Sequence, residues 1–184
     1  MEYPETSQLT DRELLKLFTA GDVAAFEVIL ARYEGPLLRY AARHQPMAAQ
    51  DLVQEVFLRL VKQRRELNGL ESLSSWLYRV ARNLAIDELR KEKRMERREQ
   101  IVAVPEVQEP GASVAESDEV AELVTSKLMG LPPKQRDVLI LKIQEEKSYR
   151  EISSITGLSV SNVGYLIHQG LKTLARDLRA TGVV

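Results

Sequence analysis

The 184-residue sequence has no cysteine, two histidines and few aromatic residues (5%). Without cysteine there is no disulfide framework and no thiolate metal site, and two histidines argue against a zinc site. No apolar run approaches the roughly 20 residues that span a bilayer. The acidic, polar start of the chain is unlike a secretory signal. These absences predict a cytoplasmic protein with no metal, no cofactor and no membrane insertion.

The scarcity of aromatic residues favours helices over sheets. The β-branched residues point the same way, because they do not form the alternating runs typical of strands. Apolar residues make up 44% of the chain, which is enough to bury a core. Near the middle, Pro105, Pro110 and Gly111 interrupt a stretch of small and acidic residues. We therefore predict an all-α fold of two small helical domains, residues 9–98 and 118–180, joined by a flexible acidic linker, residues 99–117.

Helix signals in the first half are local. Thr10 and Glu13 form a possible capping box, and Gly21 followed by Asp22 predicts one helix end and the next start. Gly35-Pro36 predicts a kink or break. Residues 49–65 are amphipathic, a polar loop covers 66–74, and a long helix with Trp76 in the core follows from residue 75. The apolar stripe of residues 49–65 consists of Leu52, Val53, Val56, Phe57, Leu60 and Val61.

Residues 148–176 predict a helix-turn-helix in the second domain. Ser148 and Glu151 form another capping box, Gly157 suits a left-handed helix end, and Ser159 can cap the next helix. The second helix has one apolar stripe, made of Val163, Ile167, Leu171 and Leu174. Such a pair of helices is a known way to place polar side chains in the major groove of DNA.

The net charge of −1 is unlike that of a general nucleic-acid binder, but the charges are segregated. Residues 59–98 contain twelve Lys or Arg against six Asp or Glu, whereas residues 101–124 contain six acidic residues and no basic one. Because phosphate contacts are local, the basic segment is a candidate nucleic-acid surface despite the total.

Three segments, taken in order and at their spacing, resemble the extracytoplasmic-function (ECF) sigma factors of bacterial transcription. They are DLVQEVFLRL at residues 51–60, SWLYRVARNLAIDELR at 75–90 and LPPKQRDVL at 131–139. The resemblance implies a protein without catalytic activity that binds core RNA polymerase at the β′ clamp helices and the β flap. It also implies recognition of −10 and −35 promoter DNA, and an anti-sigma factor as partner.

The resemblance assigns candidate residues in the first domain. The helix at 49–65 matches the helix that docks on the β′ clamp helices, which carries polymerase binding to Asp51, Gln54, Glu55 and Arg59. The helix from residue 75 and the loop before it match the −10 reader. Its candidates are Asn68 and Ser72 for an unstacked base, and Arg79, Arg82, Asn83, Arg90, Lys91 and Arg94 for bases or phosphates. Alternatively, Arg90 pairs with a neighbour and Arg94 belongs to a solvated helix end.

The recognition helix departs from the family pattern, which usually has Lys or Arg at the positions of Gly164, Leu166, Gln169 and often Leu171. The −35 candidates are therefore mostly uncharged: Ser161, Asn162, Tyr165, His168, Gln169 and Lys172. Asn or Gln suits adenine. Tyr165 has packing on a partner as its alternative, and His168 partial burial in the helix.

Two other classes of function compete with a sigma factor. One is a stand-alone helix-turn-helix regulator with an N-terminal sensor or dimerisation domain, although such a protein has no reason to carry the segments at 51–60 and 75–90. The other is a nucleic-acid enzyme, for which no carboxylate cluster, metal-ligand spacing or phosphate loop argues.

Overall fold

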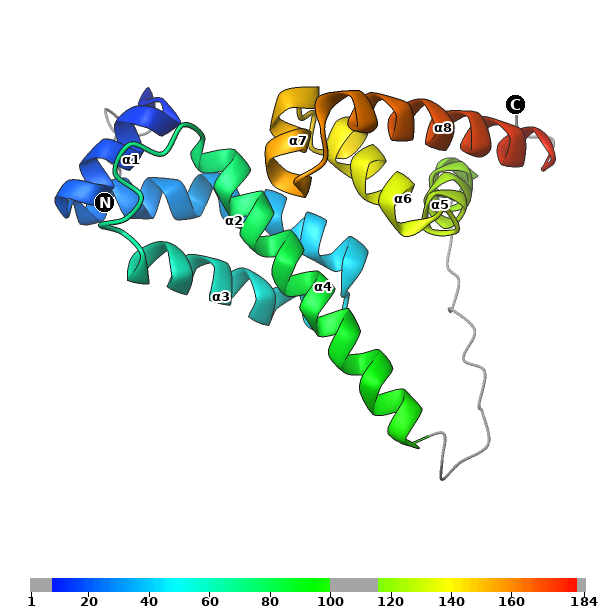
Figure 1. The fold of residues 1–184 in the computed structure, drawn as a ribbon, viewed down its shortest axis with the longest axis horizontal. Helices are drawn as coiled ribbons and strands as arrows, with labels where there is room; N and C mark the ends of the chain where they lie inside the picture. Colours follow the sequence, from blue (N-terminus) through cyan, green and yellow to red (C-terminus); the bar gives the residue numbers. More distant parts are fainter. Residues whose placement is uncertain (1–7, 100–115, 182–184) are drawn as a thin grey trace. The chain divides into compact units, whose positions relative to one another are not determined.

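A computed structural model describes residues 8–99 and 116–181 of the chain. The chain divides into two compact units, Met1–Glu96 and Arg97–Val184. The described residues form helices joined by turns and contain no strand, which confirms the all-α prediction (Figure 1). Of the predicted linker, residues 100–115 lie outside the described part. No helix among the described residues is both long and apolar enough to cross a bilayer.

The first unit packs α1 (Asp11–Ala20), α2 (Val23–His44), α3 (Ala49–Lys62) and α4 (Leu73–Glu99) around an apolar core. Aromatic contacts join the helices: the Phe26 ring lies 5.7 Å from Phe18 and 6.4 Å from Phe57. Tyr40 of α2 meets Tyr78 of α4 edge to face at 5.4 Å. Trp76 is 7% exposed, so it belongs to the core as expected.

The local helix signals of the first unit are confirmed at the start of the chain. Thr10 and Glu13 form a reciprocal capping box at α1. Gly21 ends α1 with φ 108°, a left-handed conformation that favours glycine, and the side chain of Asp22 accepts from the backbone N–H of Ala25 at the start of α2.

Of the kink or break predicted at Gly35-Pro36, the break is wrong, because α2 continues through Pro36. A proline inside a helix costs about 3 kcal/mol. On either side of Pro36, however, the same helix face is buried: Ile29 and Tyr33 before it, Leu37 and Tyr40 after it. Each such buried side chain contributes about 1.5–3 kcal/mol, so the packing of a continuous helix offsets the proline.

The second unit contains α5 (Glu116–Met129), α6 (Pro133–Leu139), a π-helical turn η2 (Ile140–Gln144), α7 (Tyr149–Thr156) and α8 (Val160–Arg179). Pro133 is the first residue of α6, a position that suits proline because its missing N–H would be unpaired there anyway. No residue pattern indicated the π-helical turn, in which Ile143 is 53% exposed. Leu171, expected in the buried stripe of α8, is 45% exposed, whereas Val163, Ile167 and Leu174 are buried.

The helix-turn-helix of α7 and α8 forms as predicted. Ser148 and Glu151 make a reciprocal capping box, Gly157 ends α7 with φ 75°, and the Ser159 side chain accepts from the Asn162 backbone N–H at the start of α8. Gly170 faces α6 so closely that an added Cβ would lie 2.8 Å from Leu139 Cδ1. This contact fixes which face of α8 points away from the unit.

Candidate nucleic-acid interface

The outer face of α3 carries the four residues expected to bind polymerase. Asp51 and Gln54 are exposed, and Glu55 and Arg59 are half-buried. Arg59 Nε donates to Glu55 Oε1 at 2.8 Å, one helical turn away. This hydrogen bond, which outweighs the opposing desolvation, holds the pKa of Glu55 below its ordinary value. The face therefore presents a preformed ion pair flanked by Asp51 and Gln54.

Beside this polar row lies an apolar groove between α2 and α3 that the sequence did not indicate. Leu58 is 52% exposed, and Val61, expected in the buried stripe, is 49% exposed. Gln54 lines the groove and links it to the polar row. The signal available from sequence was Leu58, which falls outside the apolar stripe of α3. The other lining residues are Phe26, Leu30, Glu34, Leu38, Gln50, Val53 and Phe57.

The loop before α4 places Asn68 in solvent and uses Ser72 as a helix cap. The Ser72 hydroxyl oxygen accepts from the Ser75 backbone N–H at 3.1 Å, and Ser72 also bonds the Ser75 hydroxyl at 3.0 Å. This cap starts α4 at Leu73, two residues earlier than expected. Gly69 has φ 88°, a conformation that turns the loop next to Asn68.

Four of the expected DNA contacts on α4 share one stripe. Arg79, Asn83, Arg90 and Arg94 recur at helical spacing and are all exposed. The other two lie beside the stripe: Arg82 is half-buried, and Lys91 is exposed.

Two of the α4 cations have acidic neighbours. Arg90 pairs with Asp87 at 3.2 Å, and Lys91 pairs with Glu88 at 2.9 Å. Pairing with a neighbour was the alternative to a DNA contact for Arg90. Exposed pairs of this kind are worth only about 0–1 kcal/mol, so they leave both cations available to a phosphate.

The exposed face of α8 brings the expected −35 residues together. Ser161, Tyr165, His168 and Lys172 recur on one stripe, and all four are exposed, Tyr165 by 61%. Asn162 and Gln169 form the adjacent row, where Gln169 is half-buried. His168 is therefore exposed to solvent in this unit, and the alternative prediction that it is partly buried is wrong.

Gly164 of α8, one of the departures from the family pattern, lies beside an aromatic ring of α7. An added Cβ there would lie 3.5 Å from the ring of Tyr149, the first residue of α7. Lys142 from the π-helical turn places its Nζ 5.6 Å from the centre of the same ring. A ring from α7 and a cation from the π-helical turn thus lie next to this position of α8.

Clusters of possible metal ligands were sought among the described residues of both units. No group of three or more His, Cys, Asp or Glu side chains there is placed to hold a metal ion. The surfaces described above are instead polar, basic or apolar faces of helices, the type of surface that binds macromolecules.

Comparison with known families identifies the class of protein. The family model of Sigma-70 region 2 matches residues 29–95, and that of Sigma-70 region 4 matches residues 121–174. The first match contains α3, the loop and most of α4, and the second contains most of the helix-turn-helix. Two sigma-70 regions in this order define a sigma factor.

Similar proteins define the subfamily. The ECF RNA polymerase sigma factor SigW of Bacillus subtilis is 29% identical over 180 residues, which cover 91% of this chain and 96% of SigW. The ECF RNA polymerase sigma-E factor of Escherichia coli is 28% identical over 169 residues, with 86% and 88% covered. The chain belongs to the ECF subfamily of sigma factors.

Solved structures agree on the fold. CnrH, solved in complex with the cytosolic domain of CnrY, matches with a TM-score of 0.69 at 25% identity, covering 92% of this chain and 97% of CnrH. RpoE of Bartonella quintana, solved with the anti-sigma factor NepR, matches with a TM-score of 0.67 at 21% identity, covering 84% and 96%.

Proposed function

We propose that this chain binds core RNA polymerase and directs promoter-specific initiation by reading −10 and −35 elements, acting in the cytoplasm without catalysing a reaction itself. One observation carries this proposal: both sigma-70 regions are present, in order, in one chain, and each coincides with a surface suited to its task. A regulator that used only its helix-turn-helix would not need the first region.

For polymerase docking we propose the outer face of α3, with Asp51, Gln54, Glu55 and Arg59. The preformed pair of Glu55 and Arg59 supports this role, because both ends are already oriented for charged groups on a partner. The half-exposed Leu58 and Val61 next to it add apolar area of the kind that the centre of an interface requires.

For the −10 element we propose the loop before α4 together with the basic stripe of α4. Exposed Asn68 can hydrogen-bond the edge of an unstacked base, and the stripe of Arg79, Asn83, Arg90 and Arg94 runs along one helix face as a strand backbone would require. Arg82 and Lys91 flank the stripe. Ser72 contributes by capping α4, since its hydroxyl is engaged there.

For the −35 element we propose the exposed rows of α8, which consist of Ser161, Asn162, Tyr165, His168, Gln169 and Lys172. Asn162 and Gln169 can each make the paired hydrogen bonds that select adenine, worth about 1–3 kcal/mol of discrimination per base. Lys172 is the one formal cation in this set. The β flap of polymerase is the proposed partner that holds this unit at the promoter.

Run-off transcription with purified core polymerase tests the proposal. Addition of this chain should produce a transcript from a specific promoter, and transcript sequencing should define its start and its upstream elements. Binding of duplex DNA by the chain alone, with no promoter-specific transcript in the presence of core, would favour the stand-alone regulator instead.

We also propose an anti-sigma partner that covers the polymerase-binding face. The comparison supports an anti-sigma partner, because RpoE of Bartonella quintana was solved in complex with the anti-sigma factor NepR. The partner and core polymerase should then compete for the chain. Simultaneous, unhindered binding of both in a pull-down would refute competition.

A further inference from the structure

A pocket of about 630 Å³ opens between α1 and the loop before α4. Its volume falls within the usual range of ligand sites, about 300–1,000 Å³. Asn68 lies on the loop side, and α1 forms the opposite wall. The lining residues are Arg12, Leu15, Lys16 and Thr19 of α1, with Asn68, Gly69, Leu70 and Glu71 of the loop.

The α1 wall carries two cations on one helix face. Arg12 and Lys16 are one turn apart and exposed, and neither has an ion-pair partner within residues 8–99. Like charges at this spacing disfavour a helix by a few tenths of a kcal/mol. The two side chains therefore do not stabilise α1, and both are available to bind an external anion.

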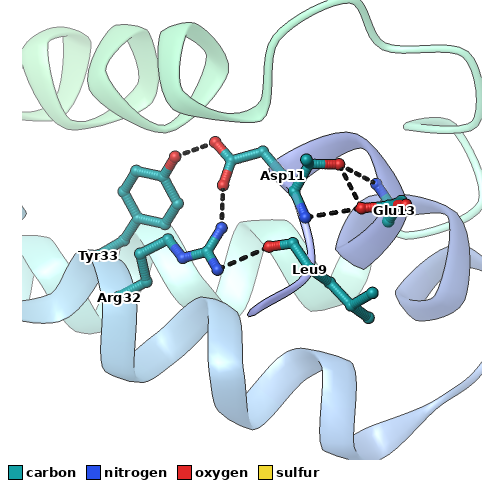
Figure 2. Close-up of polar contacts among 6 residues, drawn as sticks. Leu9, Asp11, Glu13, Arg32 and Tyr33 are labelled. Carbon is teal, nitrogen blue, oxygen red and sulfur yellow. Dashed lines mark hydrogen bonds and ion pairs between the residues drawn. The ribbon is translucent and has the colours of Figure 1, made fainter. Parts of the chain in front are cut away.

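Polar contacts hold α1 in a fixed register against the rest of the first unit. Asp11 accepts from Arg32 Nη1 at 2.7 Å and from the Tyr33 hydroxyl, and Arg32 Nη2 donates to the Leu9 carbonyl at 2.8 Å (Figure 2). Burial raises the pKa of Tyr33, and the hydrogen bond to Asp11 raises it further, so the phenol stays a neutral donor.

The anchored residue directly precedes the first cation of the pair. Because Asp11 is bonded to α2 at two points, Arg12 and the residue one turn on, Lys16, keep their side toward the loop. A mobile terminal helix would not hold two charges beside Asn68 in this way.

We propose that Arg12 and Lys16 bind the phosphate backbone of the single-stranded −10 DNA beside the base held at Asn68. This rests on the proposed function and extends the DNA path from α4 across the loop onto α1. Single-stranded DNA fits better than an acidic peptide, because the pocket joins an amide that can pair with a base edge to two cations on its opposite wall.

The test measures binding of a fluorescent single-stranded −10 oligonucleotide to the reconstituted holoenzyme over a range of salt concentrations. Each phosphate contact on a single strand adds about 0.7 to the slope of log affinity against log salt. R12Q/K16Q should therefore lower the slope by about 1.4. The swap R12K/K16R keeps both charges and should retain the slope.

A matched control removes two exposed cations elsewhere in the same unit: R39Q/K62Q should leave the slope unchanged. Thermal unfolding and core-polymerase affinity of R12Q/K16Q should equal those of the wild type, which excludes misfolding. An unchanged slope in R12Q/K16Q, while wild-type holoenzyme transcribes normally, would overturn this inference and leave the proposed function standing. If the wild-type holoenzyme failed to transcribe, that result would contradict the proposed function.

Discussion

The close contact between α8 and α6 yields a prediction with an internal control. Gly164 and Gly170 both lie within α8, so Gly→Ala at either position should gain about 0.8–1.0 kcal/mol in helix propensity. They differ in what the new Cβ meets. At Gly164 it would lie 3.5 Å from the ring of Tyr149, an ordinary van der Waals contact. G164A should therefore stabilise the second unit by up to about 1 kcal/mol.

At Gly170 the new Cβ would lie 2.8 Å from Leu139 Cδ1 and 3.2 Å from Leu139 Cγ. Leu139 is fully buried, so its side chain has no open space to move into. Overpacking of this kind costs about 1–3 kcal/mol. After the gain in propensity, G170A should range from neutral to about 2 kcal/mol destabilising, and it should be about 1–3 kcal/mol less stable than G164A.

Hydrogen exchange of the α8 amides measures this difference in the full chain, because it reports on the second unit separately from the first. G170A should also weaken binding of −35 duplex DNA by the holoenzyme, since α8 must move away from α6. If α8 in G170A is protected as well as in G164A, the account of the α6–α8 contact is wrong.

Four further predictions concern the α7 cap, the charge of Glu151, Arg90 and Tyr33. S148A should destabilise the second unit by about 1 kcal/mol in urea unfolding, because it removes the α7 cap; an unchanged midpoint would contradict the capping box. Although burial acts to raise the pKa of Glu151, hydrogen bonds from Ser148 hold it below its ordinary value. The Glu151 charge therefore stabilises at neutral pH, and this stabilisation should vanish as the pH falls below about 4.3, with a weaker pH dependence in S148A. R90A should change stability by less than about 1 kcal/mol, since its pair with Asp87 is exposed, yet it should lower the salt slope of −10 DNA binding by about 0.7; a large loss of stability with an unchanged slope would assign Arg90 to the fold. Y33F should destabilise the first unit by about 2 kcal/mol in thermal unfolding by removing a hydrogen bond to a carboxylate, and an unchanged Tm would show that this bond contributes nothing.

The features that could be predicted from sequence are those decided by a few neighbouring residues. The Thr10 and Ser148 capping boxes, and Gly157 at the end of α7, depend on groups within one helical turn. The residue types at these few neighbouring positions are therefore enough to predict them. The same holds for the stripes that bury Val163 and Ile167, because helical periodicity alone sets which residues share a face.

The features that could not be predicted depend on distant parts of the chain. Pro36 remains helical because residues on both sides of it are buried together in the core. Residues next to the proline in the sequence do not reveal this burial. Val61 and Leu171 follow the apolar periodicity of their helices but are 49% and 45% exposed, because periodicity does not determine which part of an apolar stripe becomes buried. The pairing of α1 with the loop likewise needed the structure, since Arg12 and Asn68 are far apart in sequence and meet only around one pocket.

The face of α8 proposed to contact DNA carries little positive charge. This suits a protein that recognises promoters only when it is bound to polymerase. With Lys172 as the one formal cation among the proposed −35 contacts and a net charge of −1, the second unit gains little from general attraction to phosphate. If polymerase holds both units at fixed positions, each DNA contact becomes intramolecular, and effective concentrations can raise the combined affinity by about 10²–10⁴ without new contacts. Duplex −35 DNA should therefore bind the free chain far more weakly than the holoenzyme. Equal affinities in the two states would mean that α8 recognises DNA unaided, and polymerase docking would then have no part in −35 recognition.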